Sequence, residues 1–390
     1  MSALKTWKAG LVPVLVAVVF VLPGYCLLGY GLGQASDPAE AMALEKQGRL
    51  DEAAQFWRAV IQQDPHDAAA LASLGVVLSK EQKYGEAASA YKKAIALNPK
   101  LPGIQLNLGL AEFKQGHFQA AIGPLHAAAT AEEHNLQAST LLGFSYYGAK
   151  RFAEASKYLL VAAQADPHNA ELHQVLAQSC LWARKYSCAA DEFRQILQQN
   201  PDSPSAHMLT GEALDGLERT PEAIAEFQAA AKVSPQDPNV HFGLGYLYWK
   251  SHQYEAGKGE FESVLSIDPD HPQALAYLGD IEMKRTNLDE SLSVLRKAVR
   301  LKNDIRFAYV DLGAVLMQKK QYTEAAVALR RAVELDPAQP DAHYRLGRAY
   351  QAMDNAVESQ KEFAKVRTLH EKADEPFASK MSAAPPPLPQ

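Results

Sequence analysis

The sequence lacks most features that would assign it a chemistry. Its 390 residues are not enriched in glycine or proline, and its formal net charge of −6 comes from both signs mixed along the chain. No basic block suggests nucleic-acid binding. The signatures of a P-loop, a His-Glu-x-x-His zinc site, a Cys-x-x-Cys site and a Gly-x-Ser-x-Gly nucleophile are also missing. We therefore expect no enzyme activity, no cofactor, no metal and no nucleic-acid partner.

The first 35 residues differ from the rest of the chain. Lys5 and Lys8 are followed by no charged residue before Asp37, and Ala9–Leu32 is almost wholly apolar. As a helix this segment would reach about 36 Å, enough to cross a hydrocarbon core of about 30 Å. We predict a retained membrane anchor; the alternative is a signal peptide cleaved near Ala35. Both interpretations place the remaining chain on the exported side, periplasmic or extracellular.

The stretch Ala68–Leu101 organises the chain. It reads as two amphipathic helices joined by a short turn, and the first carries Leu71, Leu74 and Leu78 at helical spacing. The second ends before Pro99, because a proline ring cannot continue a helix. The same pattern returns every 34 residues, so the period indicates a repeat architecture.

Three series of residues keep this period without insertion or deletion. Small residues in the first helices are Ala41, Gly75, Gly109, Gly143, Ala177, Gly211, Gly245, Gly279, Gly313 and Gly347. Small residues in the second helices are Ala53, Ala87, Ala121, Ala155, Ala189, Ala223, Gly257, Ser291, Ala325 and Ser359. Large residues four positions later are Trp57, Tyr91, Leu125, Leu159, Phe193, Phe227, Phe261, Leu295, Leu329 and Phe363.

The spacing has a direct physical meaning. Two helices approach closely where their side chains are small, so we expect glycine or alanine of one helix to face alanine of the other, with the large residues filling the flanks. One hairpin cannot bury its own apolar stripe, so hairpins stack on one another and the chain grows as a solenoid.

This pattern resembles the tetratricopeptide repeat family over residues 36–373. The resemblance implies an all-α fold, a right-handed superhelical solenoid of antiparallel helix pairs preceded by one hydrophobic N-terminal helix. Units would start near residues 34, 68, 102, 136, 170, 204, 238, 272, 306 and 340. Residues 374–390 end in a proline-rich run and are expected to be disordered. The resemblance also implies a peptide or protein partner, held in a concave groove lined by the first helices.

Helix geometry locates the expected groove about 130° around each first helix from its buried stripe. Apolar and aromatic residues recur there, although a merely solvated face should be polar. The candidates are Phe113, Phe144, Tyr147, Trp182, Phe242, Tyr246, Trp249, Met283 and Met317. Alternatively, some of them seal adjacent first helices together. The polar neighbours expected to select the partner are Gln178, Glu212, Asp215 and Asp280.

Four histidines also recur at one repeat position, namely His173, His207, His241 and His343. Equivalent positions in stacked units lie about 8–10 Å or more apart, whereas zinc needs ligands near 2.1 Å. We therefore expect structural packing and no metal site.

Cys180 and Cys188 fall at the end of one helix and the start of the next. Hairpin geometry could bring them within reach of a disulfide bond, and export would permit one. The alternative is two small buried or half-buried residues, and the sequence leaves the choice open.

The sequence thus predicts a non-catalytic protein-interaction scaffold, attached to a membrane only through its N-terminus. Two alternatives stay open: an accessory or assembly subunit of an exported enzyme or secretion complex, and a structural spacer that self-associates. The partner and the oligomeric state cannot be read from the sequence.

Overall fold

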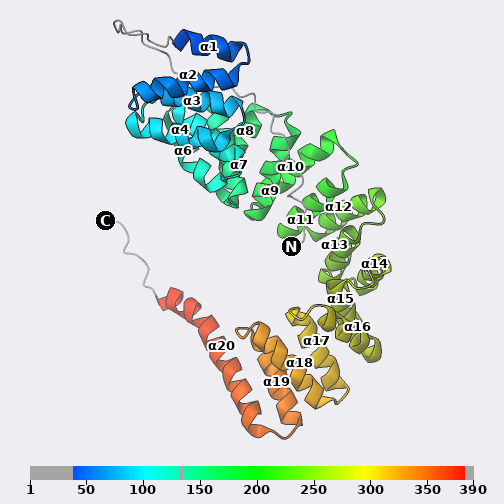
Figure 1. The fold of residues 1–390 in the computed structure, drawn as a ribbon. Helices are drawn as coiled ribbons and strands as arrows, with labels where there is room; N and C mark the ends of the chain where they lie inside the picture. Colours follow the sequence, from blue (N-terminus) through cyan, green and yellow to red (C-terminus); the bar gives the residue numbers. More distant parts are fainter. Residues whose placement is uncertain (1–37, 132–134, 383–390) are drawn as a thin grey trace, which may run out of the picture. The chain divides into compact units, whose positions relative to one another are not determined.

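The structure is a computed structural model that describes residues 38–131 and 135–382, with side chains up to residue 371. The described residues form twenty helices and no strand. Figure 1 shows the helices following one another as hairpins. The described residues divide into two compact units, between Gln199 and Asn200. The predicted all-α fold of paired helices is confirmed.

The first unit contains five helix pairs. Their bounds are α1 Pro38–Lys46, α2 Leu50–Gln63, α3 Ala68–Lys80, α4 Tyr84–Leu97, α5 Ile104–Lys114, α6 Phe118–Ala131, α7 Leu136–Gly148, α8 Phe152–Ala165, α9 Ala170–Trp182 and α10 Tyr186–Gln199.

The second unit also contains five pairs. Their bounds are α11 Pro204–Gly216, α12 Thr220–Val233, α13 Pro238–Lys250, α14 Tyr254–Ile267, α15 Pro272–Lys284, α16 Leu288–Leu301, α17 Arg306–Gln318, α18 Tyr322–Leu335, α19 Pro340–Ala352 and α20 Ala356–Ser382.

The two helices of a pair play different roles within each unit. First helices contact the first helices of neighbouring pairs, as in α5 with α7 and α15 with α17, while second helices pack on the first helix of their own and the following pair. First helices therefore lie closer together than second helices. We call the stripe of side chains through which neighbouring first helices meet the inner face, and the side where the second helices lie the outer side.

The periodic glycines mark where each first helix meets the large residue of its second helix. A Cβ atom added to any of them would lie 2.4–2.9 Å from that side chain. The pairs are Gly75 with Tyr91, Gly109 with Leu125, Gly143 with Leu159, Gly211 with Phe227, Gly245 with Phe261, Gly279 with Leu295, Gly313 with Leu329, and Gly347 with Phe363. Glycine is needed here because the partner side chain takes the volume that a methyl group would occupy.

The small residues of the second helices contact the backbone of the first helices. Ser291 donates its hydroxyl to the carbonyl of Gly279 at 2.6 Å, and Ser359 bonds Gly347 in the same way at 2.9 Å. The expectation that glycine would face alanine, with the large residues beside them, was thus correct only in part. The large residue occupies the space that the glycine leaves, and the small residue approaches the glycine carbonyl.

Each first helix ends in the same backbone conformation. One residue just after each first helix has a positive φ of 57–75°, and these residues recur every 34 positions. They are Gly48, Gln82, Gly116, Lys150, Arg184, Glu218, His252, Thr286, Lys320 and Asp354. Only two are glycine, the residue that adopts this conformation without steric cost. The stacked hairpins therefore impose this turn on eight residues that would not favour it alone.

Two sequence predictions concern the ends of the chain. Helix α20 continues to Ser382, so residues 374–382, expected to be disordered, are helical; the proline-rich run begins only at Pro385. The predicted membrane segment, residues 1–35, lies outside the described residues. Within the described ranges, no helix combines the length and the apolar content needed to span a membrane.

Candidate protein-interaction surface

An aromatic cluster lies on the inner face of the first unit. Tyr147 on α7 donates its hydroxyl to the Gln178 side chain on α9 at 2.5 Å. Trp182, at the end of α9, stacks on the Tyr147 ring with 5.8 Å between centroids, and Phe152 contacts Trp182 edge-on at 4.6 Å. These contacts join successive first helices, as one sequence interpretation proposed.

Exposure separates the two main rings of this cluster. Tyr147 is only 8% exposed, and burial raises the pKa of its hydroxyl to about 12. Trp182 is 46% exposed. The predicted residues Phe113 and Phe144 are half-buried. Of the candidates in the first unit, Trp182 is therefore the one with a large apolar area available to a partner.

The second unit has a related cluster on α13, α15 and α17. Trp249 on α13 donates its indole N–H to Asp280 on α15. Tyr277 contacts Trp249 edge-on at 5.0 Å, and Tyr246 at 5.9 Å. Burial, with smaller contributions from Tyr246 and Asp280, raises the pKa of Tyr277 to about 12. Tyr246 and Trp249 are half-buried, so part of each ring reaches the surface.

Lys284 adds a charge to the second cluster. Its ammonium group forms an ion pair with Asp280 and lies 5.2 Å from the Trp249 ring centroid and 5.1 Å from that of Tyr254. A cation over an aromatic face is attracted by the electron density of the ring. The chain itself thus shows a cation held between a carboxylate and aromatic rings on this face.

The other predicted apolar candidates are half-buried as well. Phe242 contacts Tyr277 at 5.9 Å, and Met283 and Met317 pack against the buried core of the second unit. The two methionines therefore contribute to the packing between neighbouring pairs.

Sequence reasoning missed three residues of the second cluster, Tyr277, Phe307 and Asp311. The Phe307 ring lies 4.8 Å from that of Tyr277. Tyr277 and Asp311 occupy one repeat position, which directly follows a position assigned to the groove. It also lies four residues after the repeat position of Phe307 and three before that of Asp280, and residues three and four apart are neighbours on a helix. A wider stripe would have included Tyr277 and Asp311.

Asp311 has an unusual electrostatic environment. Burial raises the pKa of its carboxyl to about 7, and the negative charge of nearby Asp280 contributes in the same direction. Arg345 and Lys284 lower the pKa without offsetting these effects. Asp311 makes no hydrogen bond or ion pair within the described part of the chain.

The polar residues predicted to select a partner are placed differently from one another. Gln178 and Asp280 accept hydrogen bonds from the two aromatic clusters. Asp215 forms an ion pair with Lys250 at 2.7 Å. Glu212 is exposed.

The four periodic histidines form one repeated contact. Each ring places Nδ1 within 2.5–2.7 Å of a glutamate on the second helix of its own pair, and Nε2 within 2.9–3.1 Å of a proline carbonyl in the preceding loop. The pairs are His173 with Glu192, His207 with Glu226, His241 with Glu260, and His343 with Glu362. Their role is structural, through hydrogen bonding as well as packing.

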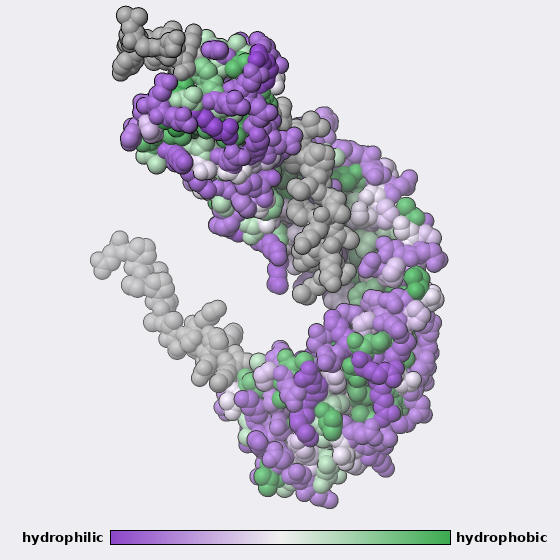
Figure 2. Space-filling view, in the orientation of Figure 1, coloured by the Kyte–Doolittle hydropathy of each residue, from purple (hydrophilic) through white to green (hydrophobic). Residues whose placement is uncertain are grey.

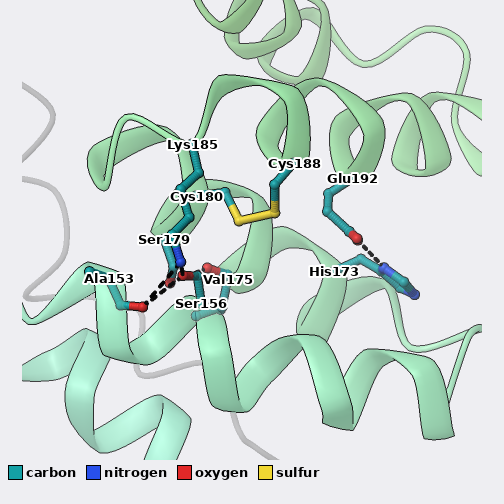
Figure 3. The surroundings of a disulfide bond; sticks show 9 residues. All are labelled: Ala153, Ser156, His173, Val175, Ser179, Cys180, Lys185, Cys188 and Glu192. Atoms are coloured by element: carbon teal, nitrogen blue, oxygen red, sulfur yellow. Dashed lines mark hydrogen bonds and ion pairs between the residues drawn. A yellow bond between two sulfur atoms is a disulfide. The ribbon is translucent and has the colours of Figure 1, made fainter. Parts of the chain in front are cut away.

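Cys180 and Cys188 are joined by a disulfide bond, with 5.8 Å between their Cα atoms. Figure 3 shows the bond linking α9 to the start of α10, beside the pair of His173 and Glu192. In the same region Lys185 donates to the Ser156 hydroxyl at 2.9 Å, which connects this hairpin to α8. The disulfide therefore lies in a part of the first unit that is already well connected.

Two hollows in the described part of the surface lie on the outer side. One, of about 520 Å³, lies over α17 between α16 and α18 and is lined by Tyr309, Leu312 and Val327. The other, of about 320 Å³, lies between α12 and α13. Figure 2 shows apolar side chains in separate patches on one face of a mostly hydrophilic surface. Neither hollow is lined by the rings of the two aromatic clusters.

Sequence models of known families match most of the described chain. Models described as TPR repeat match residues 77–116 and 313–354, and models described as tetratricopeptide repeat match 40–67, 112–179, 176–238 and 242–304. The chain belongs to the tetratricopeptide repeat family. Members of this family are generally non-catalytic scaffolds for protein interactions.

Several solved structures resemble parts of the chain. The TPR protein YrrB, described as having an unusual peptide-binding site, is 21% identical, with a TM-score of 0.41 over 50% of this chain and 100% of its own. Yeast Tom70 is 14% identical, with a TM-score of 0.40 over 85% of this chain and 91% of its own. The Cut9–Hcn1 hetero-tetramer of the APC/C is 13% identical, with a TM-score of 0.49 over 85% of this chain and 80% of its own. Comparison with curated protein sequences gave no match.

Proposed function

We propose that this tetratricopeptide protein is a non-catalytic scaffold that binds a peptide or a protein partner on the inner faces of its first helices. The observation that carries the proposal is the partly exposed aromatic cluster on each unit, fixed by hydrogen bonds between successive first helices. Aromatic anchors on a rigid support contribute strongly to affinity, because little conformational entropy is lost on binding.

The test compares the two sides of one unit. A photo-crosslinking amino acid would replace Trp182 on the inner face or Val161 on α8, which are 46% and 55% exposed. The full-length variants would be irradiated in the cells that produce the protein. We expect a discrete crosslinked product from position 182 and none from position 161. Equal crosslinking at both positions, or none at 182, would refute the assignment of the inner face.

We further propose that residues 1–35 anchor the chain to a membrane and that the repeats lie on its exported side. Two observations support this location: the apolar segment after Lys5 and Lys8, and the disulfide of Cys180 and Cys188, because such bonds persist in oxidising compartments.

A phosphatase reporter that folds only after export, fused to the C-terminus, tests this location. We expect activity from the full chain and none after deletion of residues 1–35. An inactive full-length fusion that is produced at a normal level would show that the repeats stay on the side of synthesis.

A further inference from the structure

The carboxylates on the inner face of the second unit differ in their partners. Three are matched by cations of the chain itself. The pairs are Asp215 with Lys250, Asp280 with Lys284, and Asp341 with Arg306. Glu212 on α11 is exposed as a residue, although burial of its carboxyl raises the pKa of that group. Asp311 is half-buried on α17 and forms no such pair among the described residues.

The surroundings of Asp311 favour a positive charge. Phe307 lies one helical turn before it on α17, and the Phe307 ring contacts the Tyr277 ring at 4.8 Å. Asp280, one turn after Tyr277 on α15, is close enough to raise the pKa of Asp311. Because Asp280 is already paired with Lys284, the charge of Asp311 and the electron density of the two rings are what attract a further cation.

Among the residues with described side chains, no cation of the chain takes this place. Arg345 on α19 is close enough to lower the pKa of Asp311, but it is exposed and forms no ion pair with it. Lys284 on α15 is held by Asp280 and by the rings of Trp249 and Tyr254. The arrangement around Lys284 shows the kind of contact that Asp311 lacks.

We propose that the second unit binds a peptide segment through a lysine or arginine side chain that lies beside Asp311 and against the rings of Tyr277 and Phe307. The proposal rests on the proposed scaffold function and names the chemistry of its partner. An acidic segment would bring negative charge toward Asp280 and Asp311 and is disfavoured there.

The experiment uses the immobilised full-length chain and a phage-displayed library of random dodecapeptides. We expect selected peptides to be enriched in lysine or arginine. The same selection on the Asp311→Asn variant should lose this enrichment. Glu290→Gln is the matched control, because it removes one negative charge from an exposed position of the second helix α16, outside the inner face, and it should keep the enrichment.

Binding of the best selected peptide is then measured as a function of pH. The groups that surround Asp311 are Asp280 and Lys284 on α15 and Asp341 and Arg345 on α19. Because its pKa lies at about 7, the ionised fraction falls about tenfold between about pH 8 and about pH 6, and the affinity should fall by a similar factor. The Asp311→Asn variant should bind about tenfold more weakly at about pH 8 and vary little with pH.

The outcomes separate the two proposals. Failure to select any peptide on the wild-type chain would refute peptide binding and the basic-peptide inference with it; the crosslinking at position 182 then decides whether the scaffold binds a protein partner. Selection of peptides without basic residues, or with binding unaffected by Asp311→Asn, would overturn only the basic-peptide inference. Far-ultraviolet circular dichroism of each variant verifies that the helices are intact, and an Asp311→Glu variant should restore the basic preference.

Discussion

The two units use the same three repeat positions for different contacts between successive first helices. The residues are Tyr147, Gln178 and Trp182 in the first unit, and Trp249, Asp280 and Lys284 in the second. In both units an aromatic side chain donates a hydrogen bond to a residue of the next first helix. The residue one turn after that acceptor, Trp182 or Lys284, lies over the donating ring. The first contact is neutral and exposes an indole, whereas the second is charged.

This difference shows which part of the fold is fixed and which is free to vary. The contacts of the periodic glycines with large side chains are the same in both units, because helix pairing depends on them. The inner face supports a neutral or a charged contact with the same backbone geometry. The chemical difference between the units therefore lies on the inner face.

The largest expected effect concerns a contact that only the first unit has. Reduction of Cys180–Cys188 should lower the free energy of unfolding by about 2–3 kcal/mol, since the bond closes a loop between residues eight apart and restricts the unfolded chain. The second unit has no cysteine and should not respond. Hydrogen exchange with and without reductant, resolved by peptide, measures both units at once.

The control for this effect is the Cys180→Ser, Cys188→Ser double variant. Its exchange should match that of the reduced wild type and should not change with reductant. A change of equal size in peptides from both units would contradict the assignment to the first.

The next effect tests what the two units share. Gly109→Leu in the first unit and Gly245→Leu in the second should each cost about 1–3 kcal/mol, because the new side chain overlaps Leu125 or Phe261. Gly259→Ala is the control, since a Cβ there meets no atom within 4 Å, and it should be neutral or slightly stabilising. Chemical denaturation measures all three; unchanged stability of a leucine variant would refute the packing.

The next quantity is the difference between the costs of losing the charged and the neutral contact, about 1 kcal/mol. Trp249→Phe removes a hydrogen bond to a carboxylate and should cost about 1.5–3 kcal/mol, whereas Tyr147→Phe removes a neutral one and should cost about 0.5–1.5 kcal/mol. The difference should shrink in about 1 M salt, which screens charges. Tyr248→Phe, on the partly exposed bond to Gln228, should have little effect. Equal costs for the first two variants would remove the distinction.

The smallest effect comes from the histidine contacts, three of which lie in the second unit. Burial opposes the charged form of His241, but the hydrogen bonds to Glu260 and the Pro235 carbonyl prevail and raise its pKa above about 6.5. Its stabilising contribution is therefore fully present below about pH 6.5 and is lost as pH rises through the raised pKa. The difference in unfolding free energy between wild type and His241→Asn should decline over that range, by less than about 1 kcal/mol. A difference that grows with pH would contradict the sign.

The sequence allowed the helix pairs to be predicted because their signal is local and repeated. The glycines equivalent to Gly245 and the large residues equivalent to Phe261 recur with the same 34-residue period, so their pairing follows from that period. The positive φ after each first helix, as at His252, was not predicted. Stacking imposes it, and only two of the ten residues at this repeat position are glycine.

The inner face could be predicted only in outline. Helix geometry gave the stripe with Tyr246 and Trp249, but a narrow choice of positions missed Tyr277 and Asp311. The charge state of Asp311 depends on Asp280 and Arg345, which are distant in the sequence and meet only in the packed structure. Such environments require three-dimensional information.

The most direct test of the account is hydrogen exchange of the full-length chain with and without a saturating selected peptide. We predict slower exchange in α13, α15 and α17, whose side chains form the inner face of the second unit, and unchanged exchange in α14, α16 and α18. Protection confined to the second helices, or to the hollow between α16 and α18, would contradict the claim that partners bind on the inner face.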